Sequence, residues 1–200
     1  MFPLGTVLVP SLPLALQVFE DRYRILVQHC LSEDRELGIV LIERGSEVGG
    51  QDVRSDVGTL ARINAATELP DGRWAIRVVG VRRLRVSSWL PDDPYPRAQV
   101  EDWPDTAPGP GCNHKLAQTV ARLRQALALA GEAGDLVAPA TITLSDDCIL
   151  ASHQAVALAP IGPLDQHRLL AAPTPDARLD DLDALLVETI EVLRFRLSEG

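Results

Sequence analysis

The side chains of this sequence best suited to nucleophilic catalysis are its serines, three cysteines and four histidines. A serine or cysteine nucleophile needs a base within hydrogen-bond reach, and in one large class it stands on a strained G-x-S-x-G turn. The sequence has no such turn, since Ser46 directly follows Gly45. We therefore expect no catalytic residue. An unrecognised hydrolase remains the third of three hypotheses, and its base would be one of His29, His114, His153 and His167.

Cysteine and histidine could also bind a metal ion. Cys112 and His114 are close in sequence, but a structural zinc site usually has four ligands in paired short spacings. Cys148 and His153 are five residues apart and so lie on different faces of a helix. The sequence therefore predicts no metal site and no cofactor. Three cysteines at wide spacing, with Cys30 as the third, predict free thiols and a reducing compartment.

Cationic side chains could bind phosphate groups, and nearly all of them here are arginines. The single lysine, Lys115, follows a histidine rather than a glycine, so it cannot belong to a G-x-x-x-x-G-K-[ST] loop. Strand alternation after Gly80 would place Arg83 and Arg85 on one face, where they could contact RNA phosphates. Interleaved acidic residues and the absence of an aromatic stacking row argue against nucleic acid as a partner. RNA binding is therefore the second hypothesis, with the candidates Arg73, Arg77, Arg83 and Arg85.

Aromatic side chains could anchor a polypeptide, because such residues dominate the binding energy of many protein interfaces. Four of the eight aromatics lie between residues 74 and 103. Trp74 belongs to a regular strand pattern and is expected in the core. The candidate polypeptide-binding residues are Trp89, Tyr95 and Trp103, joined by Phe19 and Tyr23 at an expected strand-to-helix junction.

Short strands and one helix must position these side chains. Apolar residues recur at helical spacing over residues 21–32, and elsewhere before residue 100 the pattern is mostly of period two. Pro-Asp-Gly at 70–72 predicts a hairpin, Gly80 a bulge or bend, and the stretch 45–50 a flexible turn. Strands are expected at residues 37–42, 57–67, 74–89 and 97–103. Several short, bent strands with one inserted helix are typical of a small, partly closed β-barrel.

The composition changes at residues 104–111, Pro-Asp-Thr-Ala-Pro-Gly-Pro-Gly, which marks a domain boundary. Alanine and leucine at helical spacing follow, so we expect a helical bundle. Its first helix should end near Gly131 or Gly134. Ser145 is the expected N-cap of a second helix, Asp165 caps a short third, and residues 176–197 form a long fourth.

Charge and hydropathy limit the partners. The 200 residues carry 28 acidic and 19 basic side chains, a formal net charge of −9, which repels phosphate backbones. No stretch approaches the roughly 18 apolar residues of a membrane span, and prolines 3, 10 and 13 interrupt any signal-peptide helix. The expected location is cytoplasmic, with no membrane partner.

Three motifs together resemble the Lon protease N-terminal domain, including its free-standing forms. They are Phe2-Pro-Leu4, Phe19-Glu-x-Arg-Tyr23 and Pro70-Asp-Gly-Arg-Trp74, and Leu169-Leu170 with Arg178-Leu179 matches a pattern of the same domain's helical lobe. The resemblance implies an α+β fold: a PUA-like, partly closed β-barrel with one inserted helix over 1–103, a Pro/Gly linker at 104–114 and a helical bundle over 115–200.

The resemblance also implies a function, which is the leading hypothesis. Such a chain would be a non-enzymatic module that binds unfolded or extended polypeptide segments, in concert with a protease or chaperone system. The single lysine leaves neither an ATPase phosphate loop nor the Ser-Lys pair of the peptidase. Binding would bury apolar side chains between barrel and bundle, or pair main chains along an exposed strand edge. The client protein is not specified by the sequence.

Overall fold

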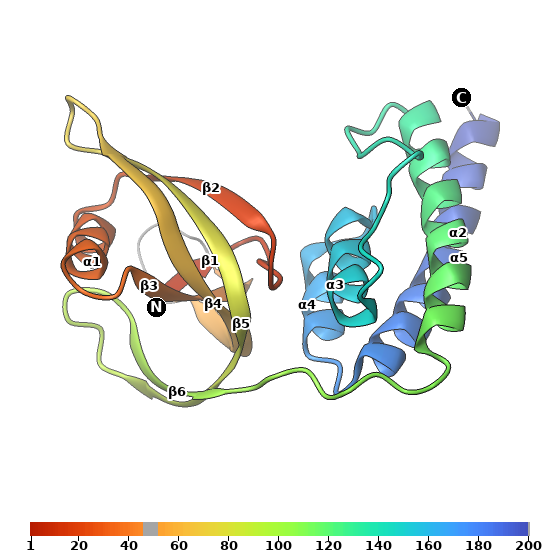
Figure 1. Cartoon of the computed structure of the whole chain (residues 1–200). Coiled ribbons are helices and arrows are strands. Elements are labelled where there is room, and N and C mark those ends of the chain that lie inside the picture. Colours follow the sequence, from red (N-terminus) through yellow and green to blue (C-terminus); the bar gives the residue numbers. More distant parts are fainter. Residues whose placement is uncertain (46–51, 200) are drawn as a thin grey trace. The chain divides into compact units, whose positions relative to one another are not determined.

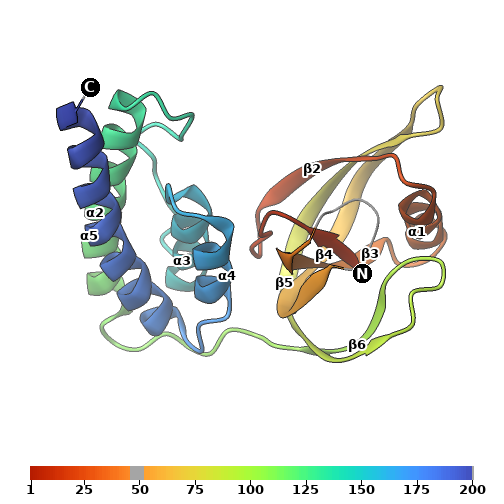
Figure 2. The ribbon, with the colours of Figure 1, turned by 180° about the vertical axis from the view of Figure 1, so that it is seen from behind.

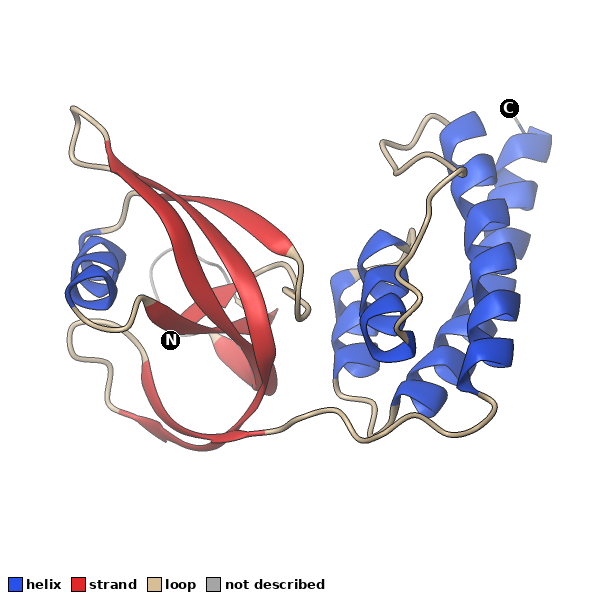
Figure 3. Ribbon diagram, in the orientation of Figure 1, coloured by secondary structure: helices blue, strands red, loops and turns tan. Residues whose placement is uncertain are grey.

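The computed structural model describes residues 1–45 and 52–199 of the chain, which form an α+β fold. Contacts within the chain separate two units, Met1–Pro104 and Asp105–Gly200. Within the described residues, the strands all belong to the first unit together with one helix, and four further helices make up the second (Figures 1 and 3). The flexible turn expected at 45–50 falls, apart from Gly45, outside the described residues.

The first unit is a mixed six-stranded sheet that curves into a half-barrel, as expected. Strand order is β1-β3-β4-β5-β2, with β1 parallel to β3 and the other pairs antiparallel; β6 also pairs with β5. Helix α1 (Asp21–Ser32) connects β2 to β3. The strands are β1 (Phe2–Leu4), β2 (Pro13–Val18), β3 (Glu36–Arg44), β4 (Val53–Glu68), β5 (Trp74–Leu90) and β6 (Arg97–Asp102).

Strand β5 bends at Gly80, which confirms the expected bulge. The register with β4 shifts there, since Leu60 pairs with Arg82 but Ala61 pairs with Gly80. A Cβ atom on Gly80 would lie 2.4 Å from the carbonyl oxygen of Val9, so a side chain would displace the segment before β2. The bend lets the two halves of β5 pair with different strands, β2 before it and β6 after it.

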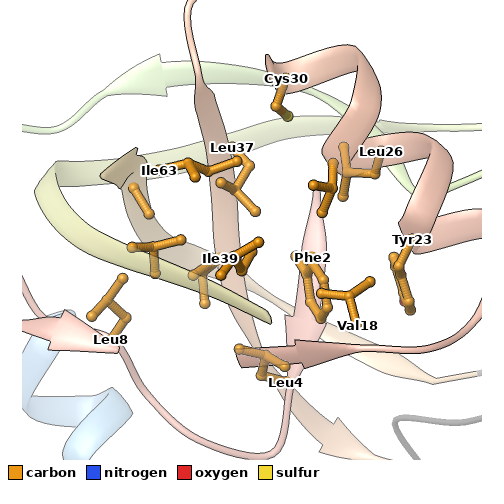
Figure 4. Packing of buried hydrophobic residues seen from close by; sticks show 14 residues of the cluster. Phe2, Leu4, Leu8, Val18, Tyr23, Leu26, Cys30, Leu37, Ile39 and Ile63 are labelled. Atoms are coloured by element: carbon orange, nitrogen blue, oxygen red, sulfur yellow. The ribbon is translucent and has the colours of Figure 1, made fainter. Parts of the chain in front are cut away.

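Helix α1 covers one end of the half-barrel (Figures 1 and 2). Its bounds match the expected range 21–32, and its apolar stripe buries Tyr23, Leu26, Val27 and Cys30 against the sheet. Figure 4 shows Tyr23 and Leu26 packed toward side chains of β1, β2 and β3. Burial raises the pKa of the Cys30 thiol to about 11, so this cysteine stays protonated at neutral pH.

The second unit contains α2 (Cys112–Glu132), α3 (Cys148–Leu158), α4 (Pro163–Leu170) and α5 (Pro175–Glu199). Helices α2 and α5 lie side by side along most of their length (Figures 1 and 2). The expected caps are corrected. Asp147, not Ser145, accepts the hydrogen bond from the Leu150 amide, and α4 begins with Pro163 at its first position, after Gly162 rather than at Asp165. Helix α2 begins at Cys112, three residues before the expected start of the helical lobe at 115.

The expectation of three free thiols was wrong: Cys112 and Cys148 form a disulfide. They are 36 residues apart in sequence, but the first turns of α2 and α3 meet and bring the two Cα atoms to 6.4 Å, within the usual range for a disulfide. Both sulfurs are buried beside Leu179 of α5. Sequence spacing could not reveal this pairing because it depends on how the helices pack.

Candidate functional site

The half-barrel has a gap between β1 and β2, which are both edge strands. These strands stand at opposite ends of the strand order, and each pairs with a single strand of the described chain. A groove of about 190 Å³ lies between them. Its walls come from β1, from β2 and from the start of α1, and they consist of Phe2, Pro3, Leu4, Ala15, Leu16, Gln17, Val18, Phe19, Glu20 and Tyr23.

The motif Phe19-Glu-Asp-Arg-Tyr23 builds one end of this groove. Tyr23 is buried and stacks on Phe2, with ring centroids 4.4 Å apart, and burial raises its pKa to about 12 (Figure 4). Arg22 lies over the opposite side of this stack, 4.5 Å from the Tyr23 ring centroid, and bonds Glu20 at 3.1 Å. These contacts hold the strand-to-helix junction in place.

Phe19 differs from the rest of its motif because its side chain is 55% exposed. It lines the groove although most large apolar residues of the unit are buried. An exposed phenyl ring beside a mainly apolar groove is typical of a recognition site rather than of a core. The volume is smaller than the roughly 300–1,000 Å³ of small-molecule and cofactor pockets, so the groove suits individual side chains.

The other predicted aromatic anchors lie elsewhere on the first unit and have structural partners. Trp89 packs beside Val40 and Val86, with the Arg54 guanidinium 5.1 Å from its ring centroid. Tyr95 bonds His29 at 2.8 Å and packs at the edge of the main core. Of the five candidates, the structure thus brings only Phe19 and Tyr23 together.

Trp103 is held between two arginines. Its ring centroid lies 4.4 Å from the Arg83 guanidinium carbon and 4.1 Å from that of Arg85, so the two arginines share a face, as expected. Arg83 is nevertheless only 1% exposed, which corrects the expectation that its side chain is available to contact RNA phosphates. A guanidinium buried under an indole ring has no surface to offer a phosphate group.

The remaining candidates for RNA binding are scattered rather than continuous. Arg73 is ion-paired with Asp71 at 2.7 Å, and the neighbouring Arg82, which was not a candidate, is ion-paired with Asp102 at 2.7 Å. Arg77 is exposed on β5, next to buried Ile76 and Val78. Because a carboxylate already neutralises Arg73, and Arg83 is buried, these four arginines form no uninterrupted cationic stripe within the described residues of the first unit.

The second unit contains a buried polar network that sequence reasoning missed. Arg178 of α5 is fully buried and donates to Asp105 at 2.6 Å, to Ser152 at 2.8 Å and to the Leu169 carbonyl at 3.1 Å. His153 bonds the other oxygen of Asp105 at 2.8 Å. The Leu-Leu and Arg-Leu pattern of the sequence could have indicated this network, because Leu169 and Arg178 belong both to the pattern and to the network.

This network does not have the geometry of a hydrolytic triad. The Ser152 hydroxyl donates to the Ile149 carbonyl and accepts from Arg178, and neither of these groups can act as a general base. Burial by itself raises the pKa of Asp105, but hydrogen bonds from His153 and Arg178 outweigh it and hold that pKa well below its usual range. A permanently ionised Asp105 therefore compensates the buried guanidinium, which is a structural role.

The described residues offer neither a metal-ligand cluster nor a membrane-spanning helix. Over residues 1–45 and 52–199, no three His, Cys, Asp or Glu side chains gather as metal ligands would. In the same part of the chain, every helix is too short or too polar to cross a bilayer.

Comparisons with known proteins support the sequence resemblance. The family profile described as the ATP-dependent protease La (LON) substrate-binding domain matches residues 1–188. Lon protease 2 of Herpetosiphon aurantiacus is 27% identical over 193 residues, which cover 95% of this chain and 23% of that protein. Lon protease of Koribacter versatilis is 25% identical over 196 residues, which cover 96% of this chain and 24% of that protein. The chain thus spans about a quarter of the length of these relatives.

Solved structures share the fold. A Lon N-terminal domain protein from Xanthomonas campestris superposes with a TM-score of 0.65 at 26% identity, covering 92% of this chain and 95% of that one. The N-terminal domain of a Mycobacterium avium complex Lon protease gives a TM-score of 0.65 at 16% identity, over 94% and 96% of the two chains. The second likeness concerns the fold alone.

Proposed function

Because the chain belongs to the Lon substrate-binding domain family, we propose that it is a non-enzymatic module that binds unfolded or extended polypeptide segments. The observation that supports this function best is the mainly apolar groove between β1 and β2, with exposed Phe19 at one end. A folded protein buries its apolar side chains, whereas an unfolded one presents them. Such a groove therefore selects clients by their loss of structure.

The binding mode follows from the two strand edges that flank the groove. An edge strand has main-chain N–H and C=O groups without a partner on its outer side, and an extended peptide can pair with them. Apolar side chains of the peptide would then enter the groove beside Leu16 and Phe19. Main-chain pairing is indifferent to sequence, so many clients could be bound weakly and released.

The partners in this proposal are unfolded client polypeptides, supplied to a protease or chaperone system. Cytoplasmic residence belongs to the same proposal. Trp89, Tyr95 and Trp103 remain candidate contact residues, but their rings already pack on Arg54, His29 and the Arg83–Arg85 pair. Phe19 is therefore the residue to change first.

The test is fluorescence anisotropy of a labelled unfolded protein fragment, titrated with the full chain at low and moderate salt. We expect saturable binding that survives added salt and weakens about tenfold in Phe19→Ala, because an aromatic anchor commonly carries more than 1 kcal/mol of the binding energy. Val100→Ala is the matched control. Val100 is also exposed and apolar, but it lies on β6 and does not line the groove.

A second pair of probes separates strand pairing from mere apolar contact. A short apolar peptide and its analogue N-methylated at every residue have the same side chains, but the analogue has no main-chain N–H group to donate along either edge. Loss of binding by the analogue supports the edge mode. The proposal would be overturned if Phe19→Ala and Val100→Ala weakened binding equally, or if no unfolded fragment bound at all. If the protein bound only single-stranded RNA, and added salt weakened that binding, the RNA-binding hypothesis with its arginines would be favoured instead.

A further inference from the structure

Helix α5 of the second unit presents large apolar side chains to solvent near its end. Val192 is 60% exposed and Phe195 62%, although the same helix buries Leu182, Leu186 and Leu193 in the unit. Isolated exposed apolar residues are ordinary on protein surfaces. These two lie about one helical turn apart, and Val192 also lines a hollow of this surface.

Two hollows adjoin along α5, and we call them together the α4–α5 groove. The first hollow, of about 470 Å³, is lined by residues at the C-terminal end of α4 and by the first half of α5. The second, of about 330 Å³, runs from the start of α4 to Arg196. Leu185 and Glu188 line both, so the hollows are continuous. From Asp181 to Arg196 the groove follows about 22 Å of helix, at ~1.5 Å per residue.

The groove combines an apolar floor with an acidic rim. Leu185, Ile161 and Val192 supply apolar surface. Its two cations are already paired, Arg168 with Asp165 at 3.3 Å and Arg196 with Asp135 at 3.0 Å. The structure records no ion pair for the rim carboxylates Asp181 and Glu188 within the described residues, so two negative charges face the groove without a cation.

A helix fits this groove better than an extended segment does. The groove lies between two helices, whose main-chain groups are bonded internally, so an extended peptide would find no strand edge and would leave its own main chain without partners. A helix satisfies its own main chain and can place an apolar stripe on Leu185 and Val192. Lysine or arginine on its flanks would meet the free carboxylates.

We infer that the α4–α5 groove docks a basic amphipathic helix of a partner protein, about four turns long. This surface belongs to the second unit and is separate from the β1–β2 groove, so the two proposals can fail independently. The acidic bias of the second unit agrees with a basic partner: residues 105–200 hold 13 acidic and 7 basic side chains.

The test uses the full chain and a fluorescein-labelled helical peptide with leucines along one face and lysines along the other. We expect saturable binding that weakens about tenfold in Glu188→Lys, which reverses charge in the middle of the groove, and in Val192→Ser, which removes floor surface. Glu191→Lys is the matched control, because it makes the same charge change on the same helix but does not line the groove. It should stay within about twofold of the unaltered protein.

Three further results would overturn the inference. Equal binding of a peptide with the same composition in scrambled order would mean charge attraction without a groove. If Glu188→Lys and Glu191→Lys weakened peptide binding equally, the binding would again be charge attraction without a groove. The third result is that the protein does not bind the peptide but forms a dimer, and that Val192→Ser abolishes the dimer. The groove would then be the contact surface for a second copy of this chain. Circular dichroism of each variant checks that the helical unit is intact.

Discussion

Asp105 is the residue on which the buried charge of the helical unit depends. Its carboxylate forms an ion pair with Arg178, whose side chain is fully buried. In Asp105→Asn the guanidinium stays buried without its counter-charge, and breaking such a pair commonly costs about 3–5 kcal/mol. We expect urea unfolding followed by circular dichroism at 222 nm to show a loss of this size. Asp165→Asn, which breaks the exposed Arg168 pair, should cost less than about 1 kcal/mol.

The same residue predicts a pH dependence. The pKa of Asp105 is lower in the folded protein than in the unfolded chain, where it is about 3.9. As pH falls through this value, the unfolded chain takes up the proton first, so the stability from Asp105 is present at neutral pH and declines below about pH 4. The difference in unfolding free energy between the unaltered protein and Asp105→Asn should therefore narrow from pH 6 to pH 3. A constant difference would show that the pair is not what Asp105 contributes.

At the scale of elements, the bend in β5 requires Gly80. A methyl group there would lie 2.4 Å from the Val9 carbonyl oxygen, so Gly80→Ala must displace the segment before β2. We expect a loss of about 1–3 kcal/mol, as for other overpacked sites, measured by tryptophan fluorescence because all three tryptophans are in the first unit. Gly131→Ala, inside α2 with open space around it, should instead stabilise its helix by up to about 1 kcal/mol.

The disulfide Cys112–Cys148 joins two elements, α2 and α3. Cross-linking residues 36 apart restricts the unfolded chain, so treatment with a dithiol should lower the unfolding free energy of the helical unit by about 2–4 kcal/mol. The double variant Cys112→Ser, Cys148→Ser should show the lower stability with and without reductant. If reductant lowered the stability of this double variant equally, the effect would not come from the disulfide. A reducing compartment would favour the dithiol form.

At the scale of the whole molecule, each unit has its own core and a size typical of an independent domain. We expect the fragment 1–104 to unfold cooperatively by tryptophan fluorescence, and the fragment 105–200 to keep its helical circular dichroism under oxidising conditions. The first fragment should also bind the unfolded test polypeptide, and the second the basic amphipathic peptide. A fragment that folds only when the other is added would contradict this division.

Local elements of this fold follow from the sequence because they depend on near neighbours. Apolar spacing over residues 21–32 predicts α1 with its observed bounds, and Pro-Asp-Gly predicts the β4–β5 hairpin, where Gly72 has a φ of 80°. The N-cap of α3 could not be predicted in the same way, because serine and aspartate are equally suitable N-cap residues. Asp147 rather than Ser145 is the cap because the helix begins directly after it. The short motifs Phe2-Pro-Leu4, Phe19-Glu-x-Arg-Tyr23 and Pro70-Asp-Gly-Arg-Trp74 together indicated the family.

Features that depend on distant segments meeting required the tertiary structure. Three such features are the pairing of Cys112 with Cys148, the burial of Arg83 under Trp103 and the contact of Arg178 with Asp105. Each joins residues that are far apart in sequence. The β1–β2 groove exists because strand order places these two strands at the open edges of the half-barrel. The sequence by itself determined which elements form and to which family they belong, since short-range spacing carries that information. Long-range packing alone decided which of their side chains remain exposed to bind a partner.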